Sequence, residues 1–333
     1  MRTVRTVSDL RTELYSAHAA RQAVGLVPTM GFLHEGHLSL MRAAREENDV
    51  VVVSLFVNPE QFGPCEDLDS YPRDEARDAA LAEAEDVDLL FAPSAHEVYP
   101  AGFSTQVTVS GLTDVLDGDP ERRGAAHFAG VTTVVAKLLN MVAPDAAYFG
   151  QKDAQQALVI QRMARDLDVA ARIEVRPTVR EPDGLAMSSR NAYLPPAERE
   201  RALSLSRALA AAEATVGAGE REAGPVLAAA RAELEGAGVE PEYLELRCAT
   251  DLSPVERVNG STLLAVAARV GCARLIDNTV LGVQTRGKPP REPPPPGGGG
   301  FVGCLPPLLN SQDRVVDQAC AAHTGRDGQE SRA

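Results

Sequence analysis

The stretch VPTMGFLHEGHLSLMRAAR, Val27–Arg45, joins an apolar run to a polar turn and then to a helical repeat. Its first residues end the apolar segment Ala23–Thr29, which we predict to be a strand closed by a proline turn. Apolar residues then recur at every third or fourth position, which predicts a helix over His37–Asn48. The stretch therefore predicts a strand, a tight turn and a helix, with His34 and His37 where the helix begins.

Strand-like and helix-like segments alternate downstream of this unit. VVVSLFV, Val51–Val57, is almost entirely apolar, as in a strand that is buried on both faces. The pattern continues with helices over Arg73–Glu85, Gly130–Ala143 and Asp153–Leu167, and strands over Val87–Pro93, Ala146–Gly150 and Ala171–Thr178. Alternation of this kind predicts an α/β fold, in which a parallel sheet carries helices on both faces.

The alternation of strand-like and helix-like segments stops after Pro177. A polar segment is followed by two Ala-rich amphipathic helices, over Ala197–Val216 and Arg221–Gly236, and by three strand-like segments that end near Leu281. The stretch GKPPREPPPPGGGG then lacks the apolar surface that would offset chain entropy. We predict a first domain over 1–178, a smaller C-terminal α+β domain over 179–283, and a Pro/Gly-rich disordered tail over 284–333.

Composition narrows the class of partners and the compartment. The 333 residues carry a formal net charge of −14, which disfavours general binding to nucleic acid or to an anionic membrane. The five cysteines form no C-x-x-C pair, so neither a disulfide framework nor a zinc ribbon is expected. With neither a secretory signal nor a long apolar span visible, we expect a cytoplasmic protein.

Three polar clusters, TMGFLHEGH, NPEQFG and GQKD, directly follow predicted strands. The carboxyl ends of parallel strands lie along one edge of a sheet, where such folds bind their ligands. Lys152, one of only three lysines in the chain, stands in the last cluster. An acidic chain binds an anion only where a few cations are gathered, so this edge is the candidate site.

The two histidines allow three interpretations. Metal binding is disfavoured, because HEGH separates His34 and His37 by three residues with a glycine between them, unlike the zinc signature H-E-x-x-H. Two solvated histidines in a first helical turn remain possible. In the third interpretation the helix N-terminus binds phosphate, with Gly31 and Gly36 allowing close backbone approach and the imidazoles adding donors.

The other clusters also have a structural alternative beside the functional one. Lys152 could neutralise phosphate, or it could be solvated beside Asp153 acting as an ordinary helix cap. In GLAMSSRNAYL, two serines and Arg190 could wrap a triphosphate, or the segment could be a surface turn. Gln61 in NPEQFG could hold a polar organic substrate, or it could belong to a proline-fixed loop.

Five motifs, PTMGFLHEGH, NPEQFG, HFAGV, FGQKDAQQ and DGLAMSSRN, together resemble the pantoate–β-alanine ligase family in order and spacing. The resemblance covers Val4–Leu281 and implies a Rossmann-like domain of the H-x-G-H nucleotidyltransferase superfamily, in a cytoplasmic homodimer. It implies ATP-dependent condensation of (R)-pantoate with β-alanine to pantothenate, with Mg²⁺ as cofactor. The expected course is through an enzyme-bound pantoyl adenylate, with AMP and diphosphate released.

The resemblance also implies roles for individual residues. His37 is the expected proton donor, and His34, Lys152 and Arg190 complete the expected catalytic set. The residues expected to bind ATP are Met30, Gly31, His34, His37, Gly150, Gln151, Lys152, Asp153, Val179, Met187, Ser188, Ser189 and Arg190. Gln61 and Gln156 are expected to hold pantoate, with Gln61 also near β-alanine. No protein side chain is expected to bind the metal, because Mg²⁺ is expected to arrive with ATP.

Three alternatives share part of this pattern. Another adenylyl- or cytidylyltransferase of the superfamily is disfavoured by Gln61 and Gln156, which suit pantoate better than a phosphorylated substrate. A tRNA-charging ligase is disfavoured by the net charge of −14 and by the lack of a visible anticodon-binding module. An inactive nucleotide-binding protein is disfavoured by His37, Lys152 and Arg190. The one departure from the family pattern is the tail, which we expect to be dispensable.

Overall fold

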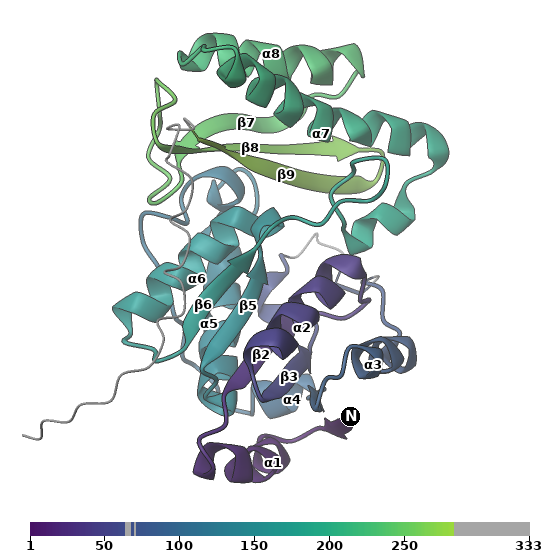
Figure 1. Cartoon of the computed structure of the whole chain (residues 1–333), viewed down its shortest axis with the longest axis vertical. Helices are drawn as coiled ribbons and strands as arrows, with labels where there is room; N and C mark the ends of the chain where they lie inside the picture. The colour runs from purple at the N-terminus through teal and green to yellow at the C-terminus, as the bar shows by residue number, and fades with distance from the viewer. Residues whose placement is uncertain (64–67, 70, 283–333) are drawn as a thin grey trace, which may run out of the picture. The chain divides into compact units, whose positions relative to one another are not determined.

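Two sheets organise the computed structural model, which describes residues 1–63, 68–69 and 71–282 (Figure 1). The larger sheet has six parallel strands in the order β1-β4-β3-β2-β5-β6. Its strands are β1 (Arg2–Val4), β2 (Val24–Thr29), β3 (Val50–Leu55), β4 (Leu89–Phe91), β5 (Ala146–Gly150) and β6 (Arg172–Arg176). The smaller sheet is antiparallel, with β7 (Pro241–Cys248), β8 (Ser261–Val270) and β9 (Ala273–Gly282) in that order. The predicted fold class is confirmed, and the predicted disordered tail lies outside the described residues.

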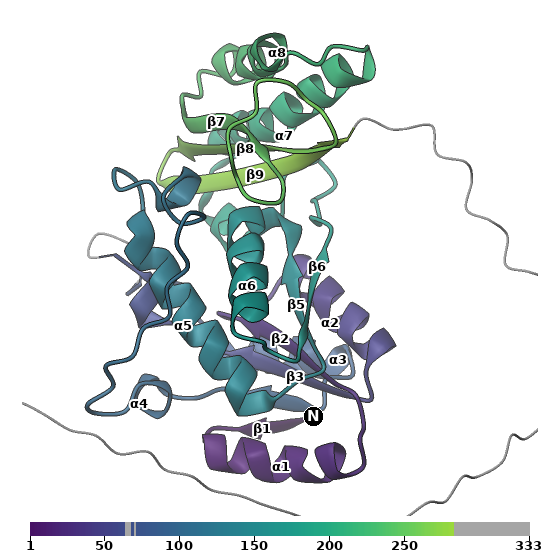
Figure 2. The same cartoon turned by 90° about the vertical axis from the view of Figure 1, so that its left-hand side faces the viewer.

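Helices cover both faces of the larger sheet, as the apolar strands predict. On one face lie α1 (Val7–Ala19), α5 (Gly124–Val142) and α6 (Ala154–Asp166), and on the other lie α2 (Glu35–Glu47) and α3 (Glu75–Ala84) (Figure 2). Side chains alternate along a strand, so Val52 packs in the cluster of α5 while Val51 and Val53 pack with α2. All three valines are fully buried, which explains why β3 is apolar at successive positions.

The strand order reverses between β2 and β5, which are neighbours in the sheet. From β2 the chain builds outward through β3 and β4, and it then returns to the other side of β2 to add β5 and β6. The connections that leave the carboxyl ends of β2 and β5 therefore run to opposite faces and open a crevice between them. The histidine turn follows β2 and the GQKD turn follows β5, so both predicted clusters meet at this crevice.

The smaller sheet packs on both of its faces. Leu264, Val266 and Ala268 of β8 belong to the apolar cluster of α7 (Pro196–Gly217) and α8 (Ala223–Gly236), which lie over the sheet at the far end of the molecule (Figure 1). The alternate residues Leu263, Ala265 and Ala267 join the apolar cluster that contains α5. The smaller sheet therefore packs directly against the part of the protein that contains the larger sheet, and both belong to one compact unit. The boundary at residue 178 stays a prediction.

The elements that were not predicted include β1, α1 and the one-turn helix α4 (Ala95–Val98). β1 has only three residues and pairs with β4, which lies more than eighty positions along the chain at Leu89–Phe91. α1 buries only a narrow stripe of Leu10, Leu14 and Ala17, and Thr6 caps it by accepting a 3.0 Å bond from the Asp9 N–H. A stripe so narrow gives little signal in a short window.

Helix α5 is the one helix of the described ranges that is long and apolar enough to cross a membrane. Its most apolar window is 78% buried inside the protein, in the apolar cluster on one face of the larger sheet. Burial of this kind is typical of the central helix of a protein core.

Candidate active site

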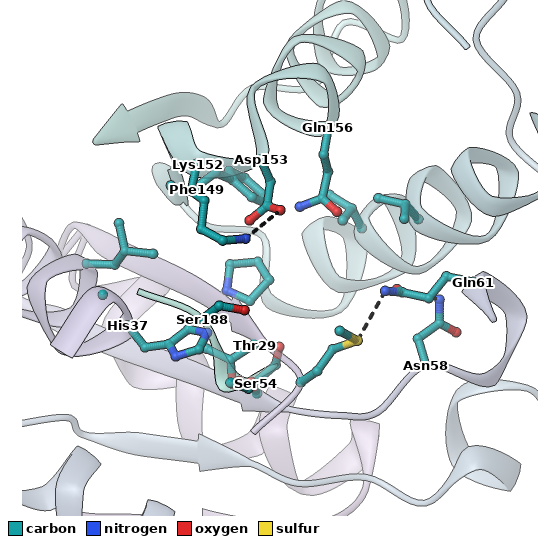
Figure 3. Close-up of a pocket in the computed structure, with 18 of the residues that line it drawn as sticks. Thr29, His37, Ser54, Asn58, Gln61, Phe149, Lys152, Asp153, Gln156 and Ser188 are labelled. Atoms are coloured by element: carbon teal, nitrogen blue, oxygen red, sulfur yellow. Dashed lines mark hydrogen bonds and ion pairs between the residues drawn. The ribbon is translucent and has the colours of Figure 1, made fainter. Parts of the chain in front are cut away.

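A cavity opens at the carboxyl ends of β2, β3 and β5 (Figure 3). The predicted site residues that line it are Met30, His34, His37, Gln61, Gly150, Lys152, Asp153, Gln156, Val179, Met187, Ser188, Ser189 and Arg190. Among the described lining residues, Gly31 and Gln151 do not occur. Gly31 shapes the turn with a φ of +86°, and Gln151 donates its amide to Asn278 Oδ1 at 3.1 Å. Folding therefore brings four separate segments of sequence to one cavity.

The turn before the histidines is held from α3. Gly31 and Phe32 both have left-handed φ, +86° and +50°, so the turn needs outside support at a non-glycine residue. Asp78, which is 1% exposed, accepts the N–H groups of Phe32 and Leu33 at 2.7 and 2.8 Å. Arg77 donates to the Leu33 carbonyl at 2.9 Å and lies over the Phe32 ring at 5.2 Å. Neither of these α3 residues was predicted, because no local pattern in the sequence links them to the turn.

Helix α2 begins at Glu35, earlier than predicted, with His34 at the N-cap position and His37 in the first turn. The His34 N–H donates to His37 Nδ1 at 3.3 Å, and the ring centres lie 4.1 Å apart. This bond assigns the proton of a neutral His37 to Nε2, the other ring nitrogen. Both rings are partly buried, which contradicts the alternative of two solvated histidines.

Both histidines are neutral at neutral pH. The pKa of His34 is lowered to about 4, mainly by burial and next by the positive charge of Lys152. Burial also lowers the pKa of His37 well below its usual value, with His34 and Lys152 as further causes. His34 Nδ1 is buried and has no hydrogen-bond partner among the described residues. A neutral imidazole still donates a hydrogen bond, so the pair can contact phosphate without carrying charge beforehand.

This ionisation predicts how stability depends on pH. Between about pH 6.5 and pH 4 the unfolded chain protonates His34 while the native protein does not. Protonation of His34 in the unfolded chain therefore costs no stability above about pH 6.5. Below that pH it favours the unfolded state, so the free energy of unfolding falls as the pH falls. We expect the wild type to lose roughly 1–2 kcal/mol more than His34→Asn between pH 7 and pH 4.5. Denaturant titrations across this range measure the difference, and parallel curves would contradict the assignment.

Gln61, in the 3₁₀ turn η1 (Pro59–Gln61), is 8% exposed and its amide is fixed from several directions. Asn58 Nδ2 donates to Gln61 Oε1 at 3.1 Å, and Gln61 Nε2 lies 3.1 Å from Met30 Sδ (Figure 3). His127 Nδ1 donates to the main-chain carbonyl of Gln61 at 2.7 Å, which holds the backbone of the turn. Tyr99 Oη donates to Asn58 Oδ1 at 2.7 Å, which fixes the orientation of that amide in turn. Neither Asn58 nor Tyr99 was predicted as a site residue, although Asn58 opens the NPEQFG motif.

Lys152 lies in the 3₁₀ turn η3 (Gln151–Asp153) between β5 and α6. Asp153 occupies the N-cap position of α6, but its side chain makes no capping bond in the described structure. Its carboxylate instead accepts from Lys152 Nζ at 3.3 Å (Figure 3). The alternative of an ordinary cap is therefore not observed. Gln156, on the first turn of α6, faces the cavity from a different side than Gln61 (Figure 3).

The MSSR loop forms a structured edge of the cavity. The Met187 N–H donates to the Val179 carbonyl at 3.0 Å, so the preceding segment folds back as a short hairpin. The Arg190 N–H donates to Ser188 Oγ at 3.3 Å, where the 3₁₀ helix η4 (Ser189–Tyr193) begins. The loop lines the cavity, which disfavours the alternative of a plain surface turn.

Comparison with known proteins decides the family. A sequence model of the family described as Pantoate-beta-alanine ligase matches residues 2–280. The chain belongs to the pantoate–β-alanine ligase family. Pantothenate synthetase from Moorella thermoacetica is 54% identical over 284 residues, which are 85% of this chain and 99% of that protein. Pantothenate synthetase from Roseiflexus castenholzii is 52% identical over 282 residues, 84% of this chain and 99% of that protein.

Solved structures of the family share the fold. Pantothenate synthetase from Thermus thermophilus matches with a TM-score of 0.80 and 48% identity, over 85% of this chain and 100% of that one. Pantoate-beta-alanine ligase from Francisella tularensis, complexed with beta-gamma ATP and β-alanine, matches with a TM-score of 0.70 and 33% identity, over 84% and 97%. The predicted family and its ligase class are confirmed. The family match ends at residue 280, so the predicted tail lies beyond it.

Proposed function

We propose that this chain condenses (R)-pantoate with β-alanine to form pantothenate, through an enzyme-bound pantoyl adenylate made from ATP. The observation that carries the proposal is the cavity itself, in a member of the pantoate–β-alanine ligase family. It places Lys152 and the MSSR loop, which can hold a triphosphate, beside the buried amide of Gln61 and that of Gln156. Amide groups suit a hydroxy acid, because they both donate and accept.

In the first step a carboxylate oxygen of pantoate attacks the α-phosphorus of ATP, and diphosphate leaves. Both reactants are anions, so the site must offset their repulsion and the charge that develops at phosphorus. Lys152 and Arg190 supply charge, and His37 Nε2 and main-chain N–H groups in the first turn of α2 supply donors. His37 then acts first as a neutral hydrogen-bond donor, and it becomes a proton donor only when bound phosphate raises its pKa.

Mg²⁺ is proposed to enter with ATP and to neutralise phosphate charge. No group of three or more His, Cys, Asp or Glu able to hold a metal ion occurs within the described ranges. Asp153 is a carboxylate on the cavity wall, already paired with Lys152. These residues fit a metal whose ligands come mainly from phosphate oxygens and water.

In the second step the amine of β-alanine attacks the acyl carbon of the adenylate, the amide bond forms, and AMP leaves. Acyl adenylates are reactive enough that a protein nucleophile is not needed, so catalysis rests on placement and exclusion of water. Gln61 is suited to this, since Asn58 donates to its side-chain oxygen and His127 binds its main-chain carbonyl. Gln61 is proposed to contact pantoate and to lie near β-alanine.

We also propose a cytoplasmic homodimer, a domain division at residue 178 and a tail that is dispensable for turnover. Mass measured in solution tests the dimer. Turnover measured after truncation at Leu281 tests the role of the tail, since the family match already ends at residue 280.

The decisive experiment for the function is isotope exchange between pyrophosphate and ATP. We expect exchange that requires pantoate and does not require β-alanine, because the adenylate forms before the amine is used. The measurement follows labelled pyrophosphate entering ATP, with each acid omitted in turn. Exchange without any acid, or only with an amino acid, would favour another member of the nucleotidyltransferase superfamily.

A further inference from the structure

The segment LIDN, Leu275–Asn278, carries two buried polar residues in the middle of β9. Asp277 is 3% exposed and Asn278 is 5% exposed, whereas most buried residues of this sheet are apolar. Neighbouring residues of a strand point to opposite faces, so the two side chains cannot serve one partner. Each of them instead binds a different segment, and both segments contribute residues to the cavity.

Asn278 binds the turn that carries Lys152. Its Nδ2 donates to the main-chain carbonyls of Gln151 and Lys152 at 3.0 and 2.8 Å, and its Oδ1 accepts from Gln151 Nε2 at 3.1 Å. The amide therefore uses both of its ends on one turn. Because the carbonyl of Lys152 is fixed directly, the backbone from which the Lys152 side chain extends is held against β9.

Asp277 binds the segment that leads into the MSSR loop. Both carboxylate oxygens accept from the guanidinium of Arg180, at 2.6 and 3.1 Å, in a two-pronged ion pair. Arg180 pairs with Ala186 in an isolated β-bridge, and the Glu181 N–H donates to the Leu185 carbonyl at 2.8 Å. The ion pair therefore anchors the base of the hairpin from which Ser188–Arg190 extend.

Stability alone does not account for this pair. The Asp277 carboxylate is buried while Arg180 is partly exposed, and burying a carboxylate carries a desolvation cost that offsets much of the attraction in the ion pair. A positioning role does account for it, since the GQKD turn and the MSSR loop come from different strands and must meet around one ligand. Errors of about 1 Å in such placement commonly cost large factors in rate.

We propose that Asp277 and Asn278 are positioning residues that hold the Lys152 turn and the Ser188–Arg190 loop at the spacing required by a triphosphate. The inference rests on the proposed function, because it takes both segments as the grip on ATP. In this proposal the C-terminal sheet contributes to nucleotide binding indirectly. Asp277 and Asn278 hold other segments in place and do not contact the nucleotide themselves. Pantoate, held by Gln61 and Gln156, lies outside this grip.

The test variant is Asn278→Asp, which keeps the shape of the side chain. A carboxylate still accepts from Gln151 Nε2, but it cannot donate to the two carbonyls and is repelled by them. We expect the KM for ATP to rise about tenfold or more in pantoate-dependent exchange, while the KM for pantoate changes less than about twofold. Asp277→Asn, which keeps one acceptor for Arg180, should show a smaller rise in the same constant.

The matched control is Val266→Ala, in the same sheet, fully buried and packed toward α7 and α8. It should lower Tm through a cavity but leave the KM for ATP unchanged. The inference is overturned if Asn278→Asp raises that KM no more than this control does. If Asn278→Asp fails to fold, Asn278→Ser keeps one hydroxyl near the turn. It is judged by the same comparison, the KM for ATP against the KM for pantoate. Absence of pantoate-dependent exchange in the wild type would instead overturn the proposed function.

Discussion

Lys152→Ala is expected to lower pantoate-dependent pyrophosphate exchange by about 10²–10³-fold or more, with the fold intact. The side chain of Lys152 is 20% exposed and forms an ion pair with the neighbouring Asp153, a local contact on which the fold does not depend. Its charge, by contrast, faces the cavity where two anions must meet. Its loss also removes one cause of the low pKa of His34, but it does not replace the missing charge.

A matched control for this variant is Lys137→Ala. Lys137 lies over the Phe103 ring at 4.6 Å and is not among the described residues that line the cavity. Exchange in this control should stay near the wild-type rate. Near-normal exchange in Lys152→Ala, with the same Tm as the wild type, would show that Lys152 does not bind phosphate.

The architecture was accessible from sequence wherever burial repeats over many residues. Val51–Val53 are buried on both faces of a parallel sheet, so the apolar run alone identified β3. The same rule failed for β1, because a three-residue strand is stabilised by its partner β4 and not by its own pattern. Parallel pairing of distant strands is a tertiary property, and a local window does not contain it.

The site shows the same division. His34, Lys152 and Gln61 were recognised because each stands in a compact motif directly after a strand. Asp78 and Asn278 were missed, because each acts on backbone groups 45 or more positions away in the chain. Sequence therefore indicated which groups face the ligand, whereas the residues that hold those groups in place became visible only in the structure.

The ionisation of the site also departs from what motifs suggest. Two histidines beside an anion site suggest positive charge, yet burial and Lys152 keep both rings neutral in the free protein. The two histidines therefore offer the cavity hydrogen-bond donors and no positive charge, in a chain whose net charge is −14. Arrival of the triphosphate, an anion, is what should favour protonation of His37.

Gly130→Ala is expected to disable the pantoate side of the site, although alanine favours a helix over glycine by about 1 kcal/mol. Gly130 lies on α5 where the helix touches the backbone of η1. A Cβ there would stand 2.2 Å from the Glu60 carbonyl oxygen and 2.7 Å from the Gln61 nitrogen. Asn58 Nδ2 also donates to the Gly130 carbonyl at 3.2 Å, so α5 and η1 cannot move apart at this point without breaking a hydrogen bond.

The methyl group must displace η1, and with it the buried amide of Gln61. We expect a loss of roughly 1–3 kcal/mol in the free energy of unfolding. The kcat/KM for pantoate should fall about 10²-fold, because an error of 1 Å at a substrate contact carries a cost of that order. Gly224→Ala in α8 is the control, since its added Cβ meets nothing within 4 Å beyond its own stretch of helix among the described residues, and it should leave both quantities near or slightly above wild type. If the two variants behave alike, the close contact between α5 and η1 does not position Gln61, and its placement must depend on Asn58 and His127 instead.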